Sequence, residues 1–262
     1  EELNNASVWK EGNINKDKNM DFIWTDGANK FDRKLYGIKS VLKNDIDVEV
    51  VTNKYNLYEM MDGKHMAKSQ ILNDKMKVKD DDLYILRPIG GGQGAGIKVM
   101  KGRDIPEGEE RKDMIQKMYG DVEKTRFAQR IKTNEIMVSE YIKDLMLYDG
   151  KVFHLRMYFV PSIINGKFKG YLLKFGKIIT AKEKYDEKRV TEHEVHDSHI
   201  KNATKDLQFP EDLISHIGQK KVDNIFKNME EILKMVSVKG EKYIKNYPEI
   251  KNGFSMFGVD FM

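Results

Sequence analysis

The spacing of hydrophobic residues along the chain predicts both strands and helices. Beyond residue 210, apolar residues recur at helical spacing as far as residue 236, which predicts one or two helices. Earlier in the chain, the segments 153–161 and 167–174 favour strands, and they flank the dipeptide Asn165-Gly166, a strong signal for a β-hairpin. A long hairpin followed by helices predicts the α+β class.

Shorter segments add to this expectation. A buried strand over residues 83–87 is stopped by Pro88 and a run of glycines, and strand character resumes over 97–100. Residues 1–20 are polar and predicted to be peripheral, and residues 181–209 are predicted to form a polar loop. The other predicted strands are 21–25, 48–51, 135–142, 177–180 and 254–262, and the other predicted helices are 53–61 and 109–125.

Composition narrows the class of protein. Hydrophobic residues make up 40% of the 262 residues and charged residues 34%, which excludes a wholly disordered chain. No apolar run approaches the roughly 18 residues that cross a bilayer, so no membrane partner is expected. The absence of cysteine excludes disulfide scaffolds and thiolate sites and favours a reducing, cytoplasmic compartment. The chain starts without methionine and stops at Met262 inside a predicted strand, so we expect a piece of a longer polypeptide.

The sharpest local feature is a glycine run, Gly90 to Gly96, with five glycines in seven residues. Backbone N–H groups that lack side chains around them can approach and bind phosphate oxygens. Arg87, just before the run, could contact the same phosphates. The run is not a phosphate loop of the GxxxxGK[ST] type, because no Lys-Ser or Lys-Thr follows it. It predicts a flexible flap over a nucleotide, and the alternative is an ordinary hairpin turn.

Two predicted strands carry polar residues that need an explanation. Asp260 lies in an apolar terminal strand, where burial of a carboxylate is costly unless Mg²⁺ or a basic side chain pairs with it. Mg²⁺ is favoured because the glycine run implies phosphates. In the strand after residue 152, His154, Arg156 and Tyr158 share one face, which either lines a cleft or faces water.

Three histidines, His193, His196 and His199, recur at intervals of three residues. Imidazole and carboxylate groups at this density suggest zinc. The spacing differs from that of HExxH, however, so the imidazoles would not stack on one helix face. A polar loop with solvated histidines is the preferred interpretation.

Taken in order, these segments resemble the tubulin–tyrosine ligase-like family, amino-acid ligases of the ATP-grasp fold. Residues 83–88 resemble the family's strand that ends in Lys-Pro before a flexible loop. Val138-Ser139-Glu140-Tyr141-Ile142 resembles its adenine-binding connector, usually Val-Gln-Lys-Tyr-Ile. The resemblance covers about residues 50–262. The further motifs that carry it are 53–55, 149–156, 171–176, 183–185, 199–202 and 257–262.

This resemblance implies an ATP-grasp fold of mixed and antiparallel sheets, with a glycine-rich flap over the nucleotide. The implied domains are an N-terminal lobe over 1–52, a central subdomain over 53–142 and a C-terminal subdomain over 143–262. The implied reaction uses ATP and Mg²⁺ to join a free amino acid to a carboxylate of an acceptor protein, such as a tubulin-like acidic tail, through an acyl-phosphate.

The resemblance also implies roles for individual residues. Asp260 would bind Mg²⁺, and the connector would bind adenine through its backbone, so that Ser139→Ala is expected to matter little. The residues implied to bind ATP are Lys54, Arg87, Gly91, Gly92, Gln93, Gly94, Gly96, Glu140, Tyr141, Ile142 and Lys174. The residues implied in catalysis are Arg156 and Lys151, which would neutralise transferring charge, and His199 and Asn202, which would lie near the substrate.

Several residues depart from the family pattern. Arg87 replaces a phosphate-contacting Lys, and His154 replaces the Asp of the family's Asp-Gly-x-Lys-Phe-Asp-Leu-Arg. Val152, Ile179 and Lys201 stand where the family has Lys, Arg and Thr. These departures keep open the alternative of a catalytically inactive nucleotide-binding or scaffold protein. Nucleic acid is not an expected partner, because a net charge of +4 is the sole support for it. The bias toward Lys, Asn and Ile fits a viral or unicellular origin.

Overall fold

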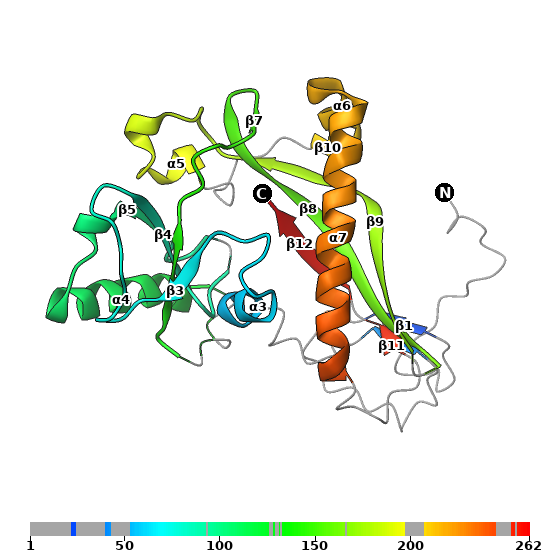
Figure 1. Cartoon of the computed structure of the whole chain (residues 1–262), viewed down its shortest axis with the longest axis horizontal. Helices are drawn as coiled ribbons and strands as arrows, with labels where there is room; N and C mark the ends of the chain where they lie inside the picture. The colour runs from blue at the N-terminus through cyan, green and yellow to red at the C-terminus, as the bar shows by residue number, and fades with distance from the viewer. Residues whose placement is uncertain are drawn as a thin grey trace.

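A computed structural model describes the parts of the chain that carry most of these segments. The described residues are 22–24, 40–42, 53–92, 94–125, 128, 131, 133–165, 167–196, 207–244, 253–254 and 256–262. Within them, the strands form one sheet of eight strands and one of four, and helices pack against both (Figure 1). The α+β class is confirmed, and most strand pairs are antiparallel.

The four-stranded sheet has the order β3-β6-β4-β5 and is antiparallel throughout. Its elements are α3 (Lys54–Met60), β3 (Ser69–Ile71), β4 (Leu83–Pro88), β5 (Lys98–Lys101), α4 (Gly108–Glu123) and β6 (Ile136–Glu140). Tyr84 and Leu86 of β4 pack against Met114 and Met118 of α4 in one buried cluster. Because side chains alternate along a strand, Arg87 and its neighbours at every second position point to the opposite face.

That opposite face is partly covered by a segment that follows the eight-stranded sheet. Val99 and Tyr141 from the four-stranded sheet and its connector form a buried cluster with Val190, and Tyr185 packs against it. The segment includes the short helices η4 (Glu187–Arg189) and α5 (His193–His196). The two sheets are therefore joined by an apolar contact on the face that carries Arg87.

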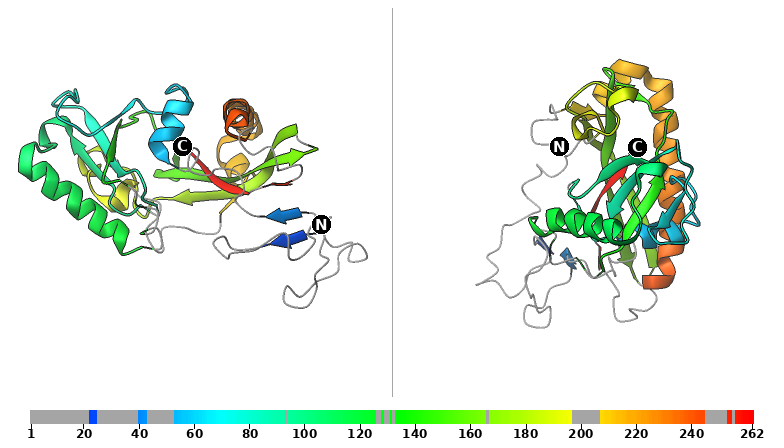
Figure 2. Two further views of the ribbon diagram at one scale, coloured as in Figure 1. Left: turned by 90° about the horizontal axis from the view of Figure 1, so that it is seen from below. Right: turned by 90° about the vertical axis from the view of Figure 1, so that its left-hand side faces the viewer.

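The eight-stranded sheet is built around the long β8–β9 hairpin. Its strands are β1 (Phe22–Trp24), β2 (Ser40–Leu42), β7 (Leu147–Tyr148), β8 (Lys151–Ile164), β9 (Lys167–Thr180), β10 (Leu207–Phe209), β11 (Gly253–Phe254) and β12 (Phe257–Phe261). Helix α6 (Glu211–Ile217) leads into α7 (Gln219–Ile244), which runs along one side of the hairpin (Figure 2). Met157 and Ile178 of the hairpin pack against Val222 and Met229 of α7. The side of β8 away from α7 is thus left for His154, Arg156 and Tyr158.

The structure corrects several element boundaries. The strand predicted at 177–180 is the end of β9, because Gly176 lets β9 continue in close contact with the backbone of Arg156. The loop predicted over 181–209 contains η4, α5 and β10. The strand predicted at 48–51 lies outside the described residues. None of the described helices combines the length and the apolar character that a membrane crossing requires.

Candidate functional site

The glycine run between β4 and β5 forms successive turns. The N–H of Ala95 donates to the carbonyl of Gly92 at 3.2 Å, and Gly94 and Gly96 have φ angles of 74° and 71°. A Cβ atom at Gly96 would overlap the backbone carbonyl of Met118 in α4. Backbone conformation and close packing on α4 therefore require two of the glycines. The structure does not confirm a flap, which stays a prediction.

Lys54 fixes the start of this run. Helix α3 begins at Lys54 because the side chain of Asn53 caps its first turn, accepting two backbone N–H groups at 3.0 Å. The Lys54 ammonium group donates to the carbonyl of Pro88 at 3.2 Å, to that of Ile89 at 3.4 Å and to that of Gly91. These hydrogen bonds hold the charged end of Lys54 beside the first residues of the glycine run.

A second cation, Arg87, lies beside Lys54. Burial lowers the pKa of Arg87, and burial together with the nearby Arg87 charge lowers the pKa of Lys54 to about 8. Across the described ranges, neither cation forms an ion pair with a carboxylate. Two adjacent, partly buried cations that no described carboxylate compensates favour the binding of an anion.

Ser139 on β6 orients the guanidinium group of Arg87. Nη2 of Arg87 donates to Oγ of Ser139 at 2.8 Å, while Nε of Arg87 is buried without an acceptor among the described residues. Oγ of Ser139 lies 2.7 Å from Oγ of Ser69. Neither serine has this role among the predictions made from the sequence. The alternation of side chains along each strand could have predicted which face of its strand each residue occupies. The strand register that brings Arg87 and Ser139 together is known only from the fold.

The predicted adenine connector follows β6. The N–H of Tyr141 donates to the carbonyl of Leu83 at 2.9 Å, and the Tyr141 ring is buried. Burial and the neighbouring Tyr185 raise the pKa of Tyr141. Glu140 is exposed, with a carboxylate oxygen 3.8 Å from the Lys68 ammonium group, and Ile142 is 47% exposed. The connector is therefore pinned at Tyr141 and open to solvent on either side.

Asp260 lies on β12 directly opposite Arg156 on β8. Nε and Nη2 of Arg156 donate to Oδ1 and Oδ2 of Asp260, the second at 3.1 Å, and Nε2 of His154 is 3.6 Å from Oδ1. This hydrogen bonding raises the pKa of Arg156. A basic partner, one of the two expectations for Asp260, is present. In Figures 1 and 2, β12 runs toward the part of the molecule that contains the four-stranded sheet.

The donor set around Asp260 permits a metal ion but does not complete a site. In the described part of the chain, no group of three His, Asp or Glu side chains could hold a metal. The Asp260 side chain is 39% exposed, so a carboxylate oxygen can still be reached from solvent. Mg²⁺ often takes one or two carboxylates and completes its shell with phosphate oxygens and water. The residues present fit such a shared site once a nucleotide supplies the remaining ligands.

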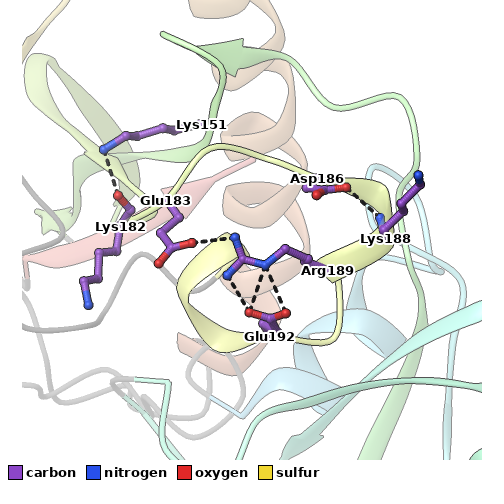
Figure 3. A network of polar contacts seen from close by, with 7 residues as sticks. All are labelled: Lys151, Lys182, Glu183, Asp186, Lys188, Arg189 and Glu192. Atoms are coloured by element: carbon purple, nitrogen blue, oxygen red, sulfur yellow. Dashed lines mark hydrogen bonds and ion pairs between the residues drawn. The ribbon is translucent and has the colours of Figure 1, made fainter.

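Lys151 lies apart from Arg156 on the same strand. Arg156 is five positions further along the strand, which places the two side chains on opposite faces of β8 and about 16 Å apart along it. The Lys151 ammonium group donates to the carbonyl of Lys182 at 2.9 Å (Figure 3). Lys151 and residues 182–189 line an open depression of about 900 Å³. Arg189 there bridges Glu183 and Glu192.

The remaining predicted site residues either lie on the eight-stranded sheet or fall outside the described residues. Lys174 is exposed on β9, and Val152 is 4% exposed in the core, where a Lys would be buried. Gln93, His199 and Asn202 lie outside the described residues. Their roles stay predictions.

Comparison with known proteins supplies independent information. The family model of the tubulin-tyrosine ligase family matches residues 48–262. Among curated proteins, none matches the chain. The matched range contains both cations, the glycine run, the connector and Asp260, and it spans far more than half of the chain.

Proposed function

The chain belongs to the tubulin-tyrosine ligase family, and on this premise we propose that it joins a free amino acid to a carboxylate of an acceptor protein at the expense of ATP. Members of this family are ATP-dependent ligases that act on protein carboxylates. The observation that supports the proposal most strongly is the pair of partly buried cations, Lys54 and Arg87, beside the start of the glycine run.

The nucleotide would lie on the face of the four-stranded sheet that carries Arg87, opposite the face that packs on α4. Its phosphates would meet Lys54, Arg87 and the backbone of the glycine run, and its adenine would meet the connector at residues 140–142. This placement uses the ATP-grasp arrangement, in which the nucleotide lies between two sheets. It is supported by the exposed end of the connector and by the contact between the sheets at Tyr141 and Tyr185.

The reaction would proceed in two substitutions. A carboxylate oxygen attacks the γ-phosphorus of ATP, the bond to the β–γ bridging oxygen breaks, and an acyl-phosphate and ADP form. The amine then attacks the acyl carbon, phosphate leaves, and the amide forms with loss of a proton. Such chemistry depends on in-line positioning and charge neutralisation rather than on a protein nucleophile.

The residues of this chain would supply that positioning and charge. Arg87 and Lys54 would hold the phosphates, and Arg156 would neutralise charge on the transferring group. Asp260 would hold Mg²⁺, which neutralises phosphate charge when it is bound. His199 and Asn202 keep their predicted roles near the substrate, and an acidic protein tail remains the proposed acceptor. Lys151 was predicted to neutralise transferring charge with Arg156, but it lies on the opposite face of β8, so the proposal leaves this role to Arg156.

A catalytically inactive nucleotide-binding protein is the second candidate. The observation that favours it is the ion pair between Asp260 and Arg156, because Arg156 engages the carboxylate that is proposed to bind the metal ion. His154, at the position of a family Asp, is also close to the same carboxylate at 3.6 Å. In this case the chain would bind ATP without turnover.

An incorporation assay distinguishes the two candidates. Labelled glutamate, glycine and tyrosine are offered with Mg·ATP to candidate acceptors that carry acidic tails. The ligase proposal predicts ATP-dependent transfer of one of them, and transfer should be lost in Arg156→Met. Binding of ATP without transfer to any acceptor would favour the inactive candidate.

A further inference from the structure

We infer that Ser139 and Ser69 position the guanidinium group of Arg87 for phosphate, so that Arg87 and Ser139 act as a matched pair across two strands. The inference deepens the proposed nucleotide site and rests on it. It concerns a hydrogen-bonded chain that crosses three neighbouring strands, β4, β6 and β3.

The register of the strands brings the three side chains together. Ser139 of β6 is the partner of Ser69 in β3 and of Ile85 in β4. Arg87 lies two residues beyond Ile85 and therefore points to the same face. The distances are 2.8 Å from Nη2 of Arg87 to Oγ of Ser139 and 2.7 Å from there to Oγ of Ser69.

The direction of each hydrogen bond follows from the number of protons available. Oγ of Ser69 donates its single proton to the carbonyl of Ala67 at 2.7 Å. It must then accept from Ser139, whose own Oγ accepts from the arginine, since each hydroxyl carries one proton. The chain thus runs one way, from Arg87 to a backbone carbonyl of the chain leading into β3. The hydrogen bond from Nη2 to Ser139 thereby orients the guanidinium plane.

Burial makes this chain selective for an anion. Ser139 is 1% exposed, so water does not replace a lost partner. Nε of Arg87 is buried without an acceptor in the described ranges, and an unsatisfied buried donor is unfavourable. A phosphate oxygen that accepts from the N–H groups of Arg87 other than Nε would offset the cost of holding the partly buried charge, and the serines determine where that oxygen must lie.

The lengths of the two side chains match. Arg87 is long and its partner Ser139 is short, and together they span the distance between β4 and β6. A shorter cation such as Lys would need a longer acceptor such as Gln to span the same distance. Exchange of one residue alone would either leave a gap or cause a clash. Exchange of both would restore a cation–acceptor contact of similar span. The inference therefore predicts that the two positions are energetically coupled.

Calorimetric titration of the full chain with Mg·ATP tests this coupling. We expect Arg87→Lys and Ser139→Gln each to weaken binding about tenfold, because each loses a charge-assisted hydrogen bond. The double variant should bind at least fivefold more tightly than the product of the two single effects. Purely multiplicative effects would overturn the inference.

A second set of variants separates positioning from folding. Ser139→Ala should weaken Mg·ATP binding about tenfold but leave adenosine binding unchanged, and Ser139→Thr, which keeps the hydroxyl, should retain both. Ser215→Ala on α6, a matched loss of an exposed serine, is the control. Equal losses for ATP and adenosine, or an unchanged ATP affinity in Ser139→Ala, would count against positioning. Should Ser139→Ala melt below the assay temperature, Ser69→Ala is judged by the same criteria.

The outcome remains separable from that of the proposed function. Absence of Mg·ATP binding by the unaltered chain would contradict the proposed function itself. The same variants are therefore also titrated with inorganic pyrophosphate, which probes the cation without the adenine. Pyrophosphate binding with the predicted coupling would support the inference alone, and absence of binding to both probes would overturn it.

Discussion

At the scale of single residues, the site is defined by cations whose charge is only partly compensated. Arg156 has Asp260 as its partner, whereas among the described residues Lys54 donates to backbone carbonyls alone and Arg87 donates to a hydroxyl. The interpretation of the connector from sequence assigned no role to the side chain of Ser139. The hydrogen bond from Arg87 changes that expectation, because the serine now supports the phosphate side of the site.

Lys54 makes nucleotide affinity depend on pH. Its pKa is lowered from 10.5 to about 8, mainly by burial. The folded protein therefore loses this proton near pH 8, whereas the unfolded chain keeps it up to about pH 10.5. The free energy of unfolding of the nucleotide-free protein therefore contains a contribution that rises with pH across this window. Mg·ATP affinity should show the opposite trend and fall as the pH passes about 8, because phosphate favours the charged amine.

Titrations between pH 6.5 and 9.5 test this dependence. Lys54→Met should flatten the profile and weaken binding at pH 7, and Lys101→Met on β5, which is exposed, is the matched control. A profile that stays unchanged in Lys54→Met would show that another group titrates.

Asp260→Asn tests the role of the carboxylate opposite Arg156. Both side chains are about one-third exposed, so loss of the pair should destabilise the nucleotide-free protein by only about 1 kcal/mol. If Asp260 also holds Mg²⁺, the shift in melting temperature caused by Mg·ATP should fall markedly. Asp223→Asn on α7, at the other face of the sheet, is the control. A shift equal to that of the unaltered chain would contradict the metal assignment.

At the scale of elements, the sequence predicts those segments whose pattern is local. The β8–β9 hairpin, β4 and the helices α4 and α7 follow from periodicity and from the Asn165 turn, whose φ is 52°. The short strands β2 and β3 carry too few residues to show a period. Cross-strand partners such as Asp260 and Arg156 are 104 residues apart, and their register depends on how β12 adds to β8.

The glycine run is best tested through its packing on α4. Gly96→Ala should destabilise the protein by about 1–3 kcal/mol, because a Cβ atom would meet the carbonyl of Met118 and the φ of 71° is strained for alanine. Gly120→Ala on α4 has nothing within 4 Å and should stabilise by about 0.5–1 kcal/mol. Chemical denaturation measures both. Equal stability of the two variants would mean that the run does not pack on α4.

At the scale of the whole molecule, two sheets meet through a few specific contacts. The cluster of Val99, Tyr141 and Val190 joins them on one side, and Lys239 of α7 pairs with Asp62 after α3 on another. The hydrophobic pattern predicted the α+β class and the resemblance predicted the family, and both are now confirmed. The resemblance did not predict the orientation of Arg87, because this orientation depends on side chains at positions where the chain departs from the family pattern.

Binding of Mg·ATP to the cation pair is the central claim, and one calorimetric comparison tests it most directly. The unaltered chain should bind Mg·ATP, and Arg87→Met should weaken that binding at least tenfold while leaving the nucleotide-free protein folded. Lys101→Met, an exposed cation removed from β5, should bind as the unaltered chain does. Absence of binding at millimolar ATP, or equal affinity in Arg87→Met, would contradict the account.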